Sequence, residues 1–209
     1  TGWNDASGKT PKQVWTQGQG IDNRHWFPHF DDLSDKLLTE TIITFDTGFS
    51  ILSNGTLLSE EVIGSKQRVH YAMQKPHSSY LVMIAIGDYG IDSVLTSSGT
   101  PIRNWYYNST PEKMEPTFRG TTELMEFLES YTGVSYPWES YSQVPVHDFL
   151  YGAMENTTAT IFSDKFYVDS AEFATANYVY VNAHEMAHQQ GSAPEQEANY
   201  QAFLTTTQH

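Results

Sequence analysis

The residues best suited to chemistry lie between Val179 and Gln190, where the chain reads VYVNAHEMAHQQ. This stretch carries His184, Glu185 and His188 in H-E-x-x-H spacing. Residues four apart lie on one face of a helix, so both imidazoles can bind one Zn²⁺ while Glu185 lies near the open position of the metal. The alternative is a pair of core histidines satisfied by hydrogen bonds. The glutamate between them favours a hydrolytic zinc site.

Composition limits the partners and the ligands. The chain has 209 residues, no cysteine and a formal net charge of −14, so any metal must use histidine and carboxylate. The negative charge repels nucleic acid and anionic lipid surfaces and attracts cationic ligands such as the free amino end of a peptide. No apolar run is long enough to span a bilayer. We expect no signal peptide in this chain, and its compartment stays open.

The elements that must position the site begin with a β-rich first half. Apolar alternation and β-branched residues predict strands at residues 39–46, 49–54, 56–64, 68–74 and 80–89. Asn54-Gly55 is a strong signal for a two-residue hairpin turn. Around residues 102–111 the pattern changes. We therefore expect an α+β protein with a β-rich domain at 1–105 and a second domain at 106–209.

The second half predicts helices mixed with strands. Leu124, Phe127, Leu128 and Tyr131 have helical spacing, and Gly133 is a C-terminal stop. Strands are expected at 142–149 and 154–162. Asp169 followed by Glu172 resembles a capping box that opens the helix of the H-E-x-x-H motif. On that helix one face is expected to form a buried stripe that includes both histidines, and its members are Phe173, Ala176, Tyr180, Val181, His184, Ala187 and His188.

A second motif identifies a resemblance. Residues 152–156 read Gly-Ala-Met-Glu-Asn, and WTQGQGIDNRHWFPHFDD near the start has Phe27-Pro28 and Asp31 at matching positions. Together with H-E-x-x-H, these segments resemble the aminopeptidase N family of zinc aminopeptidases in order and spacing, from about Val14 to Gln189.

The resemblance implies a β domain that leads into a thermolysin-like catalytic domain, one Zn²⁺ and a peptide substrate with a free amino terminus. The pentapeptide would lie on a strand at the cleft edge, where an extended peptide can pair with its backbone. Glu155 would bind the substrate's α-ammonium, and Gln19 would help to hold the same amine. The substrate-binding set is then Gln19, Gly152, Ala153, Met154, Glu155 and Asn156.

From Gln190 onward the chain departs from the family. The position of the family's third zinc ligand, a glutamate, falls at Thr207, which cannot replace a carboxylate. The tail offers Glu195 as the third ligand, ahead of Glu197, because Glu195-Gln-Glu-Ala-Asn is similar to a ligand element of other H-E-x-x-H peptidases. Glu195 is alternatively the capping-box partner of Ser192.

Three further readings of the chain stay open. In the first, the chain is a fragment or composite that lacks its third ligand. In the second, it is a weakly active or inactive domain that binds peptide and zinc. In the third, it is an endopeptidase defined by its tail. The family's oxyanion-stabilising tyrosine has no counterpart that the sequence can place, and neither Tyr151 nor Tyr178 is assigned that role. The sequence specifies neither the preferred side chain of the substrate nor the oligomeric state.

Overall fold

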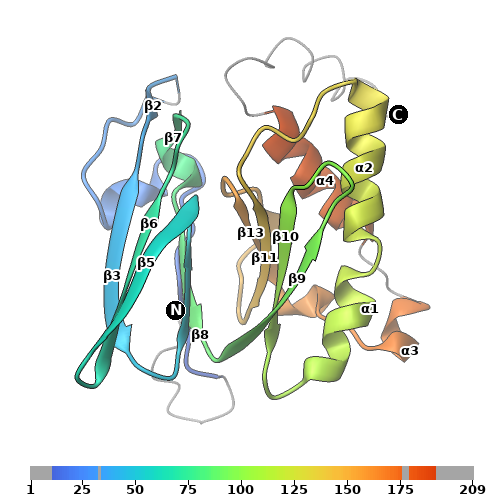
Figure 1. Ribbon diagram of the computed structural model, residues 1–209, viewed down its shortest axis with the longest axis horizontal. Coiled ribbons are helices and arrows are strands. Elements are labelled where there is room, and N and C mark those ends of the chain that lie inside the picture. Colours follow the sequence, from blue (N-terminus) through green and yellow to red (C-terminus); the bar gives the residue numbers. More distant parts are fainter. Residues whose placement is uncertain (1–10, 33, 176–178, 192–209) are drawn as a thin grey trace.

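The protein is α+β, with a first half made of strands and short 3-10 turns and a second half that combines strands with helices (Figure 1). A computed structural model describes residues 11–32, 34–175 and 179–191. The expected fold class is therefore confirmed.

In its described residues, the first half contains three small antiparallel sheets. β3, β6 and β5 form one sheet, in that order; β1, β8 and β4 form another; and β2 pairs with β7. The bounds are β1 (Val14–Trp15), β2 (Lys36–Leu37), β3 (Glu40–Asp46), β4 (Ser50–Ser53), β5 (Thr56–Ile63), β6 (Lys66–Ala72), β7 (His77–Ser78) and β8 (Ile84–Gly87). The 3-10 turns η1 (Asp22–His25) and η2 (Ser79–Leu81) lie beside one another.

The second half is built on one five-stranded sheet in the order β12-β13-β11-β10-β9. Its strands are β9 (Tyr89–Leu95), β10 (Pro101–Tyr107), β11 (Tyr141–Val146), β12 (Ala153–Met154) and β13 (Ala159–Ser163). β11 runs parallel to both β10 and β13, whereas β9 and β12 are antiparallel edges. The helices are η3 (Pro111–Lys113), α1 (Met114–Phe118), α2 (Thr121–Thr132), η4 (Asp164–Phe166), α3 (Ser170–Phe173) and α4 (Val179–Gly191).

Local sequence signals account for the helix ends. Gly133 follows α2 with φ of 70°, a left-handed conformation that glycine adopts without a steric penalty, and its N–H donates to the Glu129 carbonyl. Asp169 and Glu172 form both hydrogen bonds of a capping box at the start of α3. The stop at Gly133 and the capping box itself are confirmed, but the prediction that the box opens the H-E-x-x-H helix is wrong, because α3 ends at Phe173 and the motif lies on the separate helix α4. The structure ends α3 at Phe173 and begins α4 at Val179, with residues 176–178 outside the described part.

Three strand predictions are wrong. β4 and β5 do not form a hairpin across Asn54-Gly55, because β4 pairs with β8 and β5 with β6. The apolar run 80–89 is divided between η2, β8 and the start of β9, so its pattern reports burial rather than one strand. The expected strand 154–162 is two antiparallel strands, β12 and β13, because the chain reverses at Thr158, where φ is 65°.

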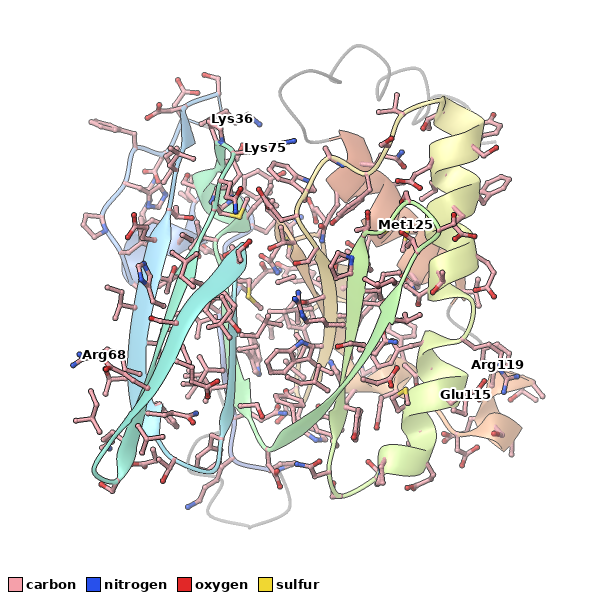
Figure 2. All side chains as sticks on the ribbon, in the orientation of Figure 1. Lys36, Arg68, Lys75, Glu115, Arg119 and Met125 are labelled. Atoms are coloured by element: carbon pink, nitrogen blue, oxygen red, sulfur yellow. The ribbon has the colours of Figure 1, made fainter. Side chains whose placement is uncertain are left out.

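One core joins the two halves. Trp15, Leu52 and Met83 pack in the same buried cluster as Trp105 and Val144. Polar contacts cross the same junction: Lys75 points from the first half toward the second, and its ammonium donates to the Pro137 carbonyl at 2.6 Å (Figure 2). A second cluster packs α2 and α4 against the sheet.

The division into domains is a proposal. A boundary between residues 105 and 106 falls inside β10. Because β9 and β10 pair with the sheet of the second half, we propose an earlier division near Asp88 as the alternative.

Candidate active site

Helix α4 carries the H-E-x-x-H motif, and its buried face differs from the expected one. Val181 and Ala187 are buried as expected, but the side chain of Tyr180 is 70% exposed, His184 is exposed and His188 is half-buried. The prediction that both histidines lie on a buried stripe is therefore wrong. The helix packs through other residues instead: Val181, Asn182, Glu185, Met186, Ala187, Gln189 and Gln190. This packing leaves both imidazoles accessible to a ligand.

The two histidine side chains converge. Their Nε2 atoms lie 3.0 Å apart, and the rings meet edge to face at 4.5 Å between centroids. Two nitrogen ligands of a tetrahedral zinc ion, each about 2.0–2.1 Å from the metal, are about 3.3 Å apart. The observed separation is close to that spacing. It is also short enough for one neutral ring to donate to the other.

Glu185 lies between the histidines in sequence but faces the interior, with 6% of its surface exposed. Burial raises the pKa of its carboxyl to about 8, and the neighbouring Glu155 carboxylate contributes to the shift. Burial also lowers the pKa of His188, where Glu155 acts in the opposite direction and His184 adds to the lowering. β12, which ends one residue before Glu155, packs against α4, in agreement with these directions.

The pentapeptide forms the edge of the five-stranded sheet. Ala153 pairs with Phe162 and Met154 with Ile161, so among the described strands β12 has the single neighbour β13. Gly152 is exposed, and its carbonyl accepts from Ser163 N at 2.9 Å. Met154 belongs to the core, and Asn156 is fully buried. This placement leaves the outer backbone edge of β12 open to an extended chain.

Glu155 follows β12 and is half-buried. The Tyr80 hydroxyl, on η2, donates to Glu155 Oε1 at 3.5 Å. Burial and the carboxylate beside it raise the pKa of Tyr80 to about 12, so the hydroxyl keeps its proton and remains a donor at neutral pH. The first half of the chain thus contributes directly to the surroundings of Glu155.

Gln19 lies in an exposed turn, where its N–H donates to Gln17 Oε1 at 3.2 Å. The segment is fixed by Asn23, whose buried amide donates to the carbonyls of Ser79 and Val82 on either side of Tyr80. The structure therefore brings the Gln19 segment to η2. No hydrogen bond between the described residues joins Gln19 to Glu155.

The donor set fits part of a zinc site. Two imidazole nitrogens converge, and the Glu155 carboxylate adds to the raised pKa of Glu185, an effect that a cation in front of α4 would relieve. Within residues 11–32, 34–175 and 179–191, no three His, Cys, Asp or Glu side chains are grouped to hold a metal. Glu195 and Glu197, the expected third ligands, lie outside the described residues.

Sequence reasoning missed several residues that hold the site. Gln189, directly after the second histidine, is fully buried and hydrogen-bonded to the turn that follows the pentapeptide. The sequence predicts a hairpin turn at Asn54, yet this residue is buried and its amide donates to the Thr157 carbonyl at 2.7 Å. Tyr80 lay within a predicted strand. Only Gln189 had a usable signal, because it is a polar residue on a helix face shared with Glu185 and Met186.

A helix with H-E-x-x-H, packed behind a mixed sheet whose edge strand leads to a half-buried glutamate, defines the class of metallopeptidases. Comparison with known proteins gives the family. Residues 1–81 match the Peptidase M1 N-terminal domain and residues 117–191 match the Peptidase family M1 domain. The two matches follow the order of the domains and cover most of the chain. The chain belongs to peptidase family M1, which includes aminopeptidase N.

Similar proteins come from plants, animals and bacteria. The chain is 26% identical over 192 residues to Aminopeptidase M1-A of Oryza sativa subsp. japonica, covering 88% of the chain and 22% of that protein. It is 27% identical over 188 residues to human Glutamyl aminopeptidase, covering 88% and 20%. With Aminopeptidase N of Acetobacter pasteurianus the identity is 28% over 190 residues, covering 88% and 53%. The chain thus spans only part of the length of these relatives.

In the part of the chain that the structure describes, no helix has both the length and the apolar character needed to cross a membrane.

Proposed function

We propose that this chain is the metal-bearing part of a zinc aminopeptidase that removes residues from the amino end of peptides. The observation that carries the proposal is the convergence of the His184 and His188 Nε2 atoms, 3.0 Å apart on α4, beside β12, the edge strand that leads into Glu155. An amine-binding carboxylate beside an H-E-x-x-H motif supports cleavage at the first peptide bond. The names of the similar proteins support the same reaction class.

In this proposal His184 and His188 would hold Zn²⁺, and Glu195, outside the described residues, is the proposed third ligand. The metal, when bound, supplies a polarised carbonyl and an acidified water. Glu185 accepts the proton of that water and delivers it to the leaving amine. Its buried position keeps the carboxylate close to the reacting atoms and raises its proton affinity. At neutral pH a carboxyl with a pKa of about 8 is largely protonated, so Glu185 would act as the base only once a bound cation lowers its pKa.

Glu155 is proposed to bind the α-ammonium of the substrate and so to place its first peptide bond at the metal. A half-buried carboxylate binds a substrate ammonium more strongly than a fully solvated one, because less water screens the pair. The open edge of β12 aligns the substrate backbone without reading its side chains. Gly152, Ala153, Met154 and Asn156 are proposed to take part through this edge, and Gln19 through the adjoining segment.

The experiment measures zinc content and the release of alanine from alanine p-nitroanilide, with the amino-acetylated compound as the blocked comparison. The proposal expects one zinc ion per chain, cleavage of the free amine only, and loss of zinc in His188→Ala. His70→Ala, which removes a histidine of β6, is the matched control.

Equal cleavage of free and blocked substrates would point to an endopeptidase. Zinc binding unaffected by His188→Ala would remove the proposed metal site. Zinc bound through both histidines without any turnover would instead identify a peptide-binding and zinc-binding domain.

A further inference from the structure

Gln189 makes an unusually dense set of hydrogen bonds for a side chain with none of its surface exposed. Its Nε2 donates to the Asn156 carbonyl at 2.9 Å and to Thr160 Oγ1 at 2.7 Å. Its Oε1 accepts from Thr158 N at 3.0 Å and from the Tyr136 hydroxyl at 2.6 Å. One amide therefore satisfies backbone groups on both sides of the turn that follows Glu155.

That turn has a strained centre. Thr158 has φ of 65°, and a β-branched residue is disfavoured in this left-handed region. Three separate segments hold it: Gln189 Oε1 accepts its N–H, Gly55 N donates to its Oγ1 at 2.7 Å, and Ser142 N donates to its carbonyl at 2.8 Å. Strained residues persist where their surroundings over-determine them, and such places cluster at functional sites.

The same side chain belongs to the helix of the metal ligands. Gln189 follows His188 directly, and its backbone carbonyl accepts from Trp138 Nε1 at 2.9 Å, which fixes this turn of α4. Its side-chain amide donates to the carbonyl of Asn156, the residue after Glu155. Gln189 is bonded to His188 in the chain, and Asn156 is bonded to Glu155. A single hydrogen bond from the buried Gln189 amide to the Asn156 carbonyl therefore connects the second histidine to the proposed amine-binding carboxylate.

We propose that Gln189 is a positioning residue: by holding the Asn156–Thr158 turn, it fixes the place of Glu155 relative to His188 and Glu185. This inference rests on the proposed function and deepens it. Gln189 touches neither metal nor substrate. It sets how far the substrate's ammonium lies from the reacting carbonyl, and thus favours a free amino terminus over a blocked one.

Gln190 provides the matched control. It is the next residue of α4, is 5% exposed, and its amide also makes two hydrogen bonds, to Thr132 Oγ1 at 3.1 Å and to the Val134 carbonyl at 2.7 Å. Those partners lie at the end of α2, away from the pentapeptide. A general loss of packing or helix anchoring affects Gln189→Ala and Gln190→Ala alike, whereas loss of positioning affects only the first.

The experiment compares the two alanine variants with the unmodified chain, using free and amino-acetylated alanine p-nitroanilide, zinc content and circular dichroism. For Gln189→Ala we expect KM for the free amine to rise about tenfold or more, because Glu155 would no longer be held in place for the substrate ammonium, with zinc content unchanged. Gln190→Ala should keep the KM of the unmodified chain. Similar kinetic effects in both variants would overturn the proposal.

A second pair of variants tests whether Gln189 acts through the turn. Thr158→Gly and Thr158→Asn both tolerate positive φ, and asparagine keeps a side-chain oxygen for Gly55 N. Added to Gln189→Ala, either one should restore KM by about threefold or more, because the turn then needs less support. Recovery by neither variant would overturn the proposal.

Amide hydrogen exchange separates this inference from the proposed function. The Thr158 N–H should exchange faster in Gln189→Ala than in Gln190→Ala, whether or not the chain turns over substrate. Absence of turnover in the unmodified chain would count against the aminopeptidase assignment alone. Equal exchange at Thr158 in both variants would show that Gln189 does not hold the turn.

Discussion

We expect the free energy of unfolding to fall on acidification because of the buried side chain of His77. Its side chain is 1% exposed, and it bridges the two halves: Nε2 lies 2.8 Å from Thr39 Oγ1 and Nδ1 lies 3.2 Å from Thr157 Oγ1. Burial lowers the pKa of His77 to about 4, and the Lys36 ammonium adds to the lowering. The native state therefore holds a neutral imidazole at the junction beside the pentapeptide turn.

Acidification lowers the stability of the folded chain because His77 binds a proton more readily when the chain is unfolded. An unfolded histidine titrates near pH 6.5, so below that pH the unfolded chain takes up a proton that the folded chain refuses until about pH 4. The stability contribution of His77 is complete above pH 6.5 and is lost between these values. The free energy of unfolding should fall by about 1.3 kcal/mol from pH 7.5 to 5.5, and by about 3 kcal/mol at pH 4, from this group alone.

The assay is urea unfolding of the unmodified chain and His77→Gln at pH 7.5 and 5.5. Glutamine cannot titrate, so the stability advantage of the unmodified chain should shrink by about 1.3 kcal/mol over that interval. The comparison cancels the carboxylates, which titrate in both proteins. His25→Gln, which replaces an exposed histidine of η1, controls for removing an imidazole. Parallel curves for the unmodified chain and His77→Gln would refute the reasoning.

Three further predictions concern catalysis and the junction. Glu185→Gln should lower turnover by about a hundredfold to ten-thousandfold with zinc retained, measured by p-nitroaniline release and metal analysis; unchanged turnover would exclude it as the base. Gly55→Ala should lower the free energy of unfolding in urea by about 3 kcal/mol or more, because the φ of Gly55 is 87° and a Cβ there would overlap the backbone of β6. The control Gly133→Ala, where φ is positive but the space is open, should lower it by about 1 kcal/mol. Equal losses would contradict this prediction. Asn54→Ala should cost about 3 kcal/mol, since its buried amide serves three backbone groups, and Asn108→Ala, at an exposed site, should cost far less.

The sequence predicted those parts of the fold whose signals are local. The capping box of Asp169, the stop at Gly133 and the H-E-x-x-H helix depend on residues within one or two turns, and the structure contains all three. The strand β3 likewise follows from its own alternation. These elements needed no knowledge of what they pack against.

The failures depend on distant partners. Asn54-Gly55 has the composition of a hairpin turn, but its amide is used by Leu81 and Thr157, so the chain passes from one sheet to another. The exposure of His184 depends on which face of α4 meets the sheet. Nothing in the periodicity separates a face that packs from a face that lines a site, because both carry apolar and imidazole side chains.

The hydrogen bonds that hold the Asn156–Thr158 turn come from residues far away in the sequence, and this bears on the order of folding. The Asn54 amide meets the Thr157 carbonyl across a sequence separation of 103 residues, whereas His184 and His188 meet within one turn of helix. Contacts between distant residues require closure of a long loop and form slowly, and helical contacts form quickly. We therefore expect a folding chain to bring its two imidazoles together before the turn that follows Glu155 is in place. The surroundings of Glu155 are complete only when the two halves have docked, because Asn54 and Tyr80 of the first half contact the Thr157 carbonyl and the Glu155 carboxylate.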